Sequence, residues 1–211
     1  MQSIGLQLIL VLSFSTLAYA QDKSAVRVNQ SLRRELLKMQ EDDQKYRNEV
    51  EEIEKMALAA DEKQKKVSAL WEKQEKVDRR NIKRLVQIIN KYGWPGRSMV
   101  GKEGSLTAFL VIQHADLEYQ KKYFPLLKEA VKRGEADPQD AALLEDRILM
   151  REGKKQIYGS QLHYNEVTKE LELWPIEDED EVDARRARVG LEPLAKYAKR
   201  FGLEYKPAQK K

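Results

Sequence analysis

Residues 31–92 decide the fold and read SLRRELLKMQEDDQKYRNEVEEIEKMALAADEKQKKVSALWEKQEKVDRRNIKRLVQIINKY. In the first half, apolar residues recur at intervals of three or four positions, which places them on one face of an α-helix. This first stripe consists of Leu32, Leu36, Met39, Tyr46, Val50, Ile53 and Ala57, and the one position that it skips is Asp43. A second stripe consists of Val67, Leu70, Val77, Leu85, Ile88 and Tyr92, with Gln74 and Asn81 on or near the same face.

The helical pattern weakens between Ala57 and Asp61, which predicts a bend or a short loop there. We therefore expect residues 31–92 to form a long helical arm, either an antiparallel hairpin or one long interrupted helix. A homodimer through a parallel coiled coil of this arm is the alternative. It is the weaker arrangement, because polar Asp43, Gln74 and Asn81 would each cost stability in a tight seam.

Residues 93–205 carry the signals of a compact helical part. Gly93 and Pro95 end the arm, and a loop with Gly96, Gly101 and Gly104 follows. Beyond it, the pattern predicts a buried helix at 106–113, a helical hairpin at 117–133 and 138–152, two short strands at 157–164 and 170–174, and helices at 178–190 and 193–201. The prediction is a mostly α protein: a helical bundle with a long N-terminal arm and a small β-hairpin near the C-terminal third, forming a single domain over residues 31–205.

Residues 1–20 have the pattern of a signal peptide. They contain no charged side chain, are nearly all apolar over residues 4–14, and end in the small-x-small tripeptide AYA. The apolar segment is shorter than the roughly 20 residues of a spanning helix and lacks basic flanks, which disfavours an uncleaved anchor. We expect export to the periplasm or the extracellular space, with no membrane span after cleavage. A polar segment at 21–30 and a disordered basic tail at 206–211 complete the expected organisation.

The composition excludes several classes of protein. The chain has no cysteine, which removes disulfides, thiolate zinc sites and a cysteine nucleophile. The formal net charge of +4 is a small difference between 39 basic and 35 acidic residues, and both signs are mixed along the chain. This mixture is typical of solvated helix faces, so nucleic acid is not an expected partner.

Several polar residues fall at positions that we expect to face the interior. His114 follows the buried helix, and its ordinary pKa near 6.5 suits proton transfer. In an enzyme, His114 would be the general base, Asp116 would orient its ring, and Arg147 would clamp an anion. Further candidate ligand-binding residues are Tyr158 and Gln161, in a glycine-containing strand, and Asp43 and Asn81, which interrupt the apolar stripes.

Three interpretations of these residues remain open. The leading one is an exported binding or interaction protein, with a polar pocket for a small polar ligand or a protein partner. The second is a hydrolase-like enzyme that uses His114, and the third is a polar core network that binds nothing, because buried polar groups must be paired in any case. His114 and Asp116 are too few ligands for a metal by themselves, and no cofactor is expected.

From residue 78 onward the chain resembles an uncharacterised bacterial family, a domain of unknown function. The matching motifs are DRRN at 78–81, GWP at 93–95, QHAD at 113–116, DR at 146–147, QIYGSQ at 156–161 and VDARR at 182–186. Residues 32–44 resemble the opening helix of the family, whereas residues 46–68 show no match. Family members often have Thr at the position of Ser160, which preserves a hydroxyl group. The resemblance implies no activity.

Overall fold

The computed structural model describes residues 28–206. The predicted signal peptide and most of the polar segment after it lie outside the described residues, as do residues 207–211 of the basic tail. The described chain is mostly α-helical, with one small antiparallel sheet toward the C-terminus, as the sequence predicted.

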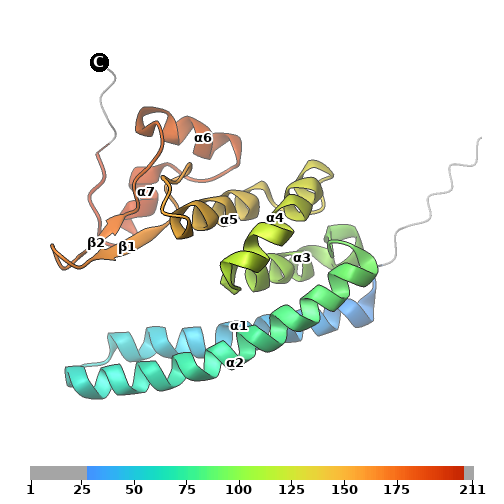
Figure 1. Cartoon of the computed structure of the whole chain (residues 1–211), viewed down its shortest axis with the longest axis horizontal. Coiled ribbons are helices and arrows are strands. Elements are labelled where there is room, and N and C mark those ends of the chain that lie inside the picture. Colours follow the sequence, from blue (N-terminus) through green and yellow to red (C-terminus); the bar gives the residue numbers. More distant parts are fainter. Residues whose placement is uncertain (1–27, 207–211) are drawn as a thin grey trace, which may run out of the picture.

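The arm is an antiparallel hairpin of α1 (Gln30–Lys55) and α2 (Ala60–Tyr92), the first of the two predicted arrangements (Figure 1). The helices begin and end at residues with suitable chemistry. The Asn29 side chain caps α1 by accepting a hydrogen bond from the backbone N–H of Leu32, at 3.0 Å. Gly93 ends α2 at φ 75°, a conformation that favours glycine.

Three helices follow the arm: α3 (Arg97–His114), α4 (Leu117–Lys132) and α5 (Pro138–Arg151). The predicted glycine-rich loop at residues 96–104 is wrong in extent, because α3 already begins at Arg97 and only Gly101, at φ 77°, interrupts it. The reason is packing. Val100 is fully buried, and a Cβ atom at Gly104 would lie 2.8 Å from its side chain, so the glycine allows close approach within this part of the helix.

The apolar core has two parts, with a polar band between them. The main core joins α1 to α5 and includes Leu36, Leu85 and Ile112. A smaller cluster at the tip of the arm consists of Val50, Val67 and Leu70, with Tyr46 and Ile53 packed against it. Between the two lies what we call the polar band: Asp43 and Arg47 of α1 with Gln74 and Asp78 of α2.

The C-terminal elements lie on the far side of α5 from the arm (Figure 1). They are β1 (Leu162–Asn165), β2 (Glu170–Leu173), the short 3-10 helix η1 (Glu179–Glu181), α6 (Val182–Arg188) and α7 (Leu194–Lys199). The two strands pair antiparallel, with His163 opposite Glu172. The first strand is shorter than predicted, because residues 156–161 form a loop whose hydrogen bonds go to α5, to the loop itself and to the backbone of residues 174–177.

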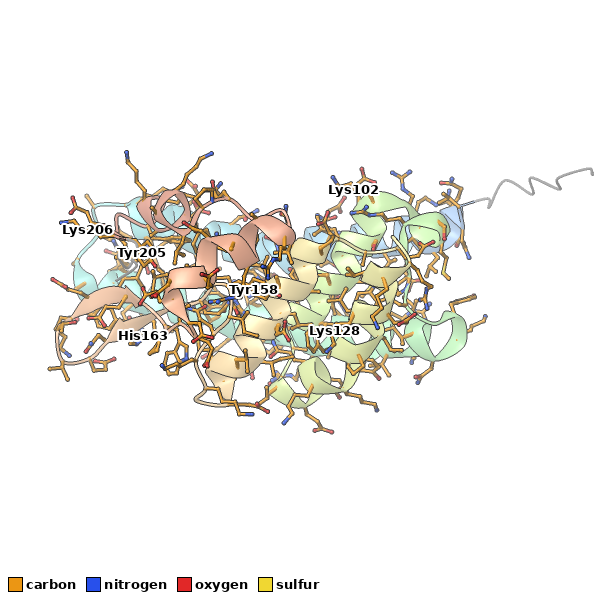
Figure 2. The ribbon with its side chains drawn as sticks, turned by 90° about the horizontal axis from the view of Figure 1, so that it is seen from above. Lys102, Lys128, Tyr158, His163, Tyr205 and Lys206 are labelled. Atoms are coloured by element: carbon orange, nitrogen blue, oxygen red, sulfur yellow. The ribbon has the colours of Figure 1, made fainter. Side chains whose placement is uncertain are left out.

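Charged side chains cover the outer faces of the helices, with Lys102 and Lys128 as labelled examples (Figure 2). None of the helices within residues 28–206 combines the length and the apolar character that crossing a bilayer requires.

Candidate functional site

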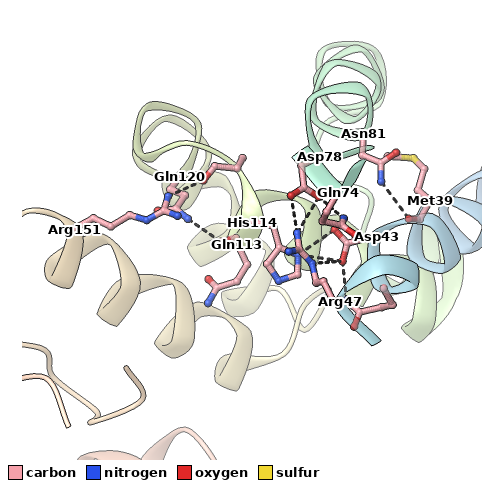
Figure 3. Close-up of polar contacts among 12 residues, drawn as sticks. Met39, Asp43, Arg47, Gln74, Asp78, Asn81, Gln113, His114, Gln120 and Arg151 are labelled. Atoms are coloured by element: carbon pink, nitrogen blue, oxygen red, sulfur yellow. Dashed lines mark hydrogen bonds and ion pairs between the residues drawn. The ribbon is translucent and has the colours of Figure 1, made fainter. Parts of the chain in front are cut away.

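His114, at the C-terminal end of α3, meets Asp43 of the polar band (Figure 3). Its Nδ1 atom lies 3.0 Å from each carboxylate oxygen of Asp43, although the two residues are 71 positions apart. Asp43 is 1% exposed, so this contact is shielded from water. Nε2 of His114 has no hydrogen-bond partner among the described residues and is not one of the buried unpartnered atoms, so it stays open to solvent.

Asp43 is held in its ionised form. Burial raises the pKa of its carboxyl, but the hydrogen bond and the charge of His114 lower it, as do Arg47 and Gln44, and the pKa ends below its ordinary value. Because a carboxylate can only accept hydrogen bonds, Nδ1 of His114 carries a proton and donates it. Asp43 therefore fixes the orientation of the ring and leaves Nε2 as its free end.

The rest of the polar band supports this pair from α1 and α2. Nη2 of Arg47 donates to both oxygens of Asp78, at 2.9 and 2.7 Å, and Nε of Arg47 lies 3.8 Å from Oδ2 of Asp43. Gln74, fully buried, donates to Oδ1 of Asp78 at 2.8 Å. The band thus links the two helices of the arm at the level of His114.

A pocket of about 110 Å³ lies beside His114 and has room for roughly four water molecules. Its lining residues are Glu75, Asp78, Arg79, Ile82, His114, Ala115 and Asp116. We predicted that Asp116 orients the imidazole, and the structure corrects this role, because Asp43 occupies the position at Nδ1. The extended backbone at Ala115 carries Asp116 outward, where it is exposed and its carboxylate has no partner among the described residues.

Arg147 of α5 is half-buried and unpaired. Its Nε atom is buried without a hydrogen-bond partner, and its guanidinium forms no ion pair with the described residues. Burial lowers the pKa of Arg147 to about 10, and the positive charges of Arg151 and Arg47 act in the same direction. Arg147 thus lies within electrostatic reach of Arg47, which neighbours the Asp43–His114 pair.

Tyr158 and Gln161 do not line the pocket at His114. Both belong to the loop at 156–161, and Figure 2 shows Tyr158 beside the C-terminal helices. Asp146 of α5 accepts hydrogen bonds from the backbone N–H groups of Ile157, Tyr158 and Ser160, at 2.7 to 3.2 Å. These bonds fold residues 156–161 against α5, which explains why the predicted strand does not extend there.

Two further contacts hold this loop closed. Gln156 accepts a hydrogen bond from the backbone N–H of Gln161 at 2.8 Å and donates to its carbonyl at 3.0 Å. Arg186 of α6, only 1% exposed, donates to the carbonyl of Tyr158 at 2.5 Å. Gly159 has φ 69° and leaves no space for a Cβ atom against Leu194. These contacts hold the loop at 156–161 in one conformation.

Asn81 also has a structural role in the arm. Its side-chain amide donates to the carbonyl of Met39 at 3.2 Å and so joins α2 to α1 (Figure 3). Of the residues predicted as a site, the structure brings Asp43, His114 and Asp116 together, whereas Arg147 is not among the residues that line the pocket at His114.

Sequence reasoning missed Arg47, Asp78 and the acceptor role of Asp146. A signal for Arg47 existed: it lies one helical turn after Asp43, at the spacing that puts two side chains on one face. Among residues 28–206, no group of three or more His, Asp or Glu side chains is arranged to hold a metal ion.

Comparison with known proteins gives one assignment. Residues 30–206 match the family of unknown function DUF6624, which spans every described helix and strand, and the chain belongs to this family. No curated protein and no solved structure matches the chain.

Proposed function

We propose that the protein binds a small polar ligand at His114. The observation that carries the proposal is the orientation of the ring: buried Asp43 holds Nδ1, and Nε2 is open to solvent. A histidine fixed at one nitrogen offers the other as a directed hydrogen-bonding group. The pocket beside it has room only for a small molecule or for one group of a larger one.

The polar groups around His114 are not all satisfied by one another, and this favours a ligand over a closed structural network. Oε1 of Gln74, Oε1 of Gln113 and Nε of Arg147 are buried and lack hydrogen-bond partners within residues 28–206. Buried polar atoms are nearly always paired in folded proteins. Gln74 belongs to the polar band and Gln113 precedes His114, so two of these unpaired acceptors lie on the elements that form the site, which supports a bound ligand over a network that only stabilises the fold.

The chain contains only two histidines, so nitrogen-15 NMR of the imidazole rings tests the proposal directly. A panel of small carboxylates, phosphates, amines and alcohols would be titrated into the labelled full chain. We expect at least one compound to shift the ring nitrogens of His114 and to leave those of His163 unchanged. The substitution Asp43→Asn should weaken that binding by about tenfold or more, because it removes a charge-assisted hydrogen bond to the ring.

His163→Gln is the matched control, because His163 lies in β1 and packs its ring against Trp174, away from the polar band. This variant should bind as the wild type does and should assign the two sets of signals. The proposal is wrong if every compound that binds does so without moving the His114 signals, or if His114→Ala binds with unchanged affinity.

A hydrolase is the second candidate, and the Asp43–His114 pair is the observation that favours it. A carboxylate at Nδ1 with a free Nε2 is the arrangement of a general base and its orienting residue. The hydroxyl of Ser105 donates to the carbonyl of Glu135, and that of Ser160 accepts from Gln161, so neither is bonded to His114. Water activated by Nε2 would then be the nucleophile.

Hydrolysis of p-nitrophenyl acetate and p-nitrophenyl phosphate separates the two candidates. For an enzyme, His114→Ala should lower the rate by about 10²- to 10⁴-fold, the usual contribution of a general base. His163→Gln should keep the wild-type rate. Equal rates for the wild type and His114→Ala would remove the hydrolase candidate and leave the binding proposal in place.

We also propose that the protein acts outside the cytoplasm, which the signal-peptide pattern of residues 1–20 supports. N-terminal sequencing of the protein purified from the producing cell tests this. A chain that begins at Gln21 is the expected result, and a chain that still begins at Met1 contradicts it.

A further inference from the structure

A second pocket adjoins the pocket at His114 along one face of α2. Its volume is about 440 Å³, and its lining residues are Ser68, Trp71, Glu72, Glu75 and Asp78. Glu75 and Asp78 also line the pocket at His114, so the two pockets share a wall. The lining positions on α2 recur at intervals of three or four residues, which places them on one side of the helix. We call the two adjoining pockets the α2 groove.

Carboxylates outnumber basic side chains in the α2 groove. Its acidic residues are Glu72, Glu75, Asp78 and Asp116, and Arg79 is the one Lys or Arg among the described residues that line it. Arg79 is paired with Glu75 at 2.6 Å, and Asp78 is paired within the polar band. Glu72 and Asp116 are exposed and form no ion pair within residues 28–206. The groove thus has one uncompensated carboxylate toward each end.

The hydrogen-bonding groups at the His114 end of the groove are mainly acceptors (Figure 3). Nε2 of His114 is an acceptor in the neutral ring, since Nδ1 carries the proton that is donated to Asp43. Gln74 is fully buried and donates to Asp78, while its Oε1 has no donor within the described residues. Nε of Arg47, a buried donor without a hydrogen bond, faces a carboxylate oxygen of Asp43 at 3.8 Å. A matching ligand therefore supplies N–H donors.

Trp71 gives the other end of the groove an aromatic wall. Its side chain is 44% exposed. The face of an indole ring attracts a positive charge, and the guanidinium of Arg47 lies over this ring at 5.7 Å from its centre. Glu72, with its free carboxylate, lines the same pocket. An exposed aromatic ring beside a free carboxylate suits a second positive charge.

These observations define the charge and the length of the ligand. We propose that the α2 groove binds a linear molecule with two ammonium groups, one beside His114 and Asp116 and the other beside Trp71 and Glu72. Asp78, at the His114 end, lies two turns after Trp71 on α2, a distance of roughly 10 Å. This inference deepens the proposed function and rests on it for the end of the ligand at His114.

Calorimetric titration of the full chain, together with the nitrogen-15 signals of His114, tests the inference. The probe is octane-1,8-diamine, whose extended chain has a similar length. Octane-1,8-diol is its uncharged counterpart, and propane-1,3-diamine is too short to reach both ends of the groove. We expect the long diamine to bind and to shift the His114 signals, and the diol to leave them unchanged. The short diamine should bind about five- to tenfold more weakly, because it can occupy only one end.

Asp116→Asn and Glu72→Gln each remove one free carboxylate from an exposed position. Each variant should weaken binding of the long diamine by about three- to fivefold, as expected for an exposed ion pair. The double variant should weaken it by about tenfold or more, because the two residues lie at opposite ends of the groove and their effects should add. Asp180→Asn is the matched control, since Asp180 is an exposed aspartate of η1, outside the groove. It should bind the diamine as the wild type does.

The inference is overturned if the diol binds as tightly as the long diamine, or if the double variant keeps the wild-type affinity. A carboxylate, phosphate or alcohol that shifts the His114 signals while the diamine does not bind also overturns it, and leaves the proposed function in place. A diamine that binds the double variant more weakly but leaves the His114 signals unmoved supports a cation site on α2 and counts against ligand binding through His114.

Discussion

Asp146→Ala is expected to destabilise the protein by about 3 to 5 kcal/mol, because it leaves three backbone N–H groups without an acceptor. Asp146 is fully buried and accepts from Ile157 at 2.7 Å, Ser160 at 2.9 Å and Tyr158 at 3.0 Å. Without these bonds the loop at 156–161 would lose its attachment to α5. Urea unfolding followed by far-UV circular dichroism measures the loss. Hydrogen exchange should show the three amides losing protection first.

Asp146→Asn separates the hydrogen bonds from the charge. Burial raises the pKa of Asp146 despite its three N–H donors, so the site tolerates a neutral group. Asparagine keeps one oxygen for Ile157 and Tyr158 but presents an NH₂ group to the N–H of Ser160. Its effect should lie between those of the wild type and alanine. Asp180→Ala, an exposed aspartate, should change stability by less than about 0.5 kcal/mol. An Asp146→Ala variant as stable as this control would contradict the role of Asp146.

Asp140→Asn is expected to stabilise the protein at neutral and higher pH by up to about 4 kcal/mol. Asp140 is 8% exposed near the N-terminus of α5. Burial first, and the charge of Asp137 second, raise its pKa to about 7, and Arg97 and Lys102 offset this only in part. The folded protein therefore resists ionisation of a group that the unfolded chain ionises freely.

The sign of the effect follows from the two pKa values. Below about pH 4 the carboxyl is neutral in both states, and the wild type and Asp140→Asn should be about equally stable. Between about pH 4 and pH 7 the unfolded state releases its proton first, so wild-type stability falls as the pH rises and levels off above about 7. Urea midpoints across this range measure the difference. A gain from Asp140→Asn that does not change with pH would contradict the explanation.

The helical hairpin could be predicted because its information is local. Two apolar stripes and a weak segment at residues 57–61 specify two helices, and the skipped position at Asp43 already indicated a polar group facing inward. The partner of Asp43 could not be predicted from the sequence. His114 lies 71 positions away, and the contact depends on which face of α3 packs against the arm. Asp116 is only two residues from His114 in the sequence, but the carboxylate that contacts the ring of His114 is that of Asp43.

In the loop at 156–161, by contrast, the local sequence pattern predicted the wrong structure. Most of its residues belong to the segment 157–164 that we predicted as a strand, but hydrogen bonds to side chains of other elements outweigh the strand pattern. Asp146 and Arg186 lie on helices before and after the loop, and both bind its backbone. No local signal in the loop reports such partners.

The polar band divides the arm into two parts, which we expect to open separately. Toward the tip, the buried apolar residues that join the helices are the small cluster of Val50, Val67 and Leu70, whereas the other ends of the helices belong to the main core. Free energies of local opening follow the buried apolar surface, so the amides of the tip should open far more often than those beside α3. His114 stands at this border. A molecule bound at His114 would join the tip of the arm to the rest of the protein. Slower hydrogen exchange of the amides throughout the tip would therefore indicate that it had bound.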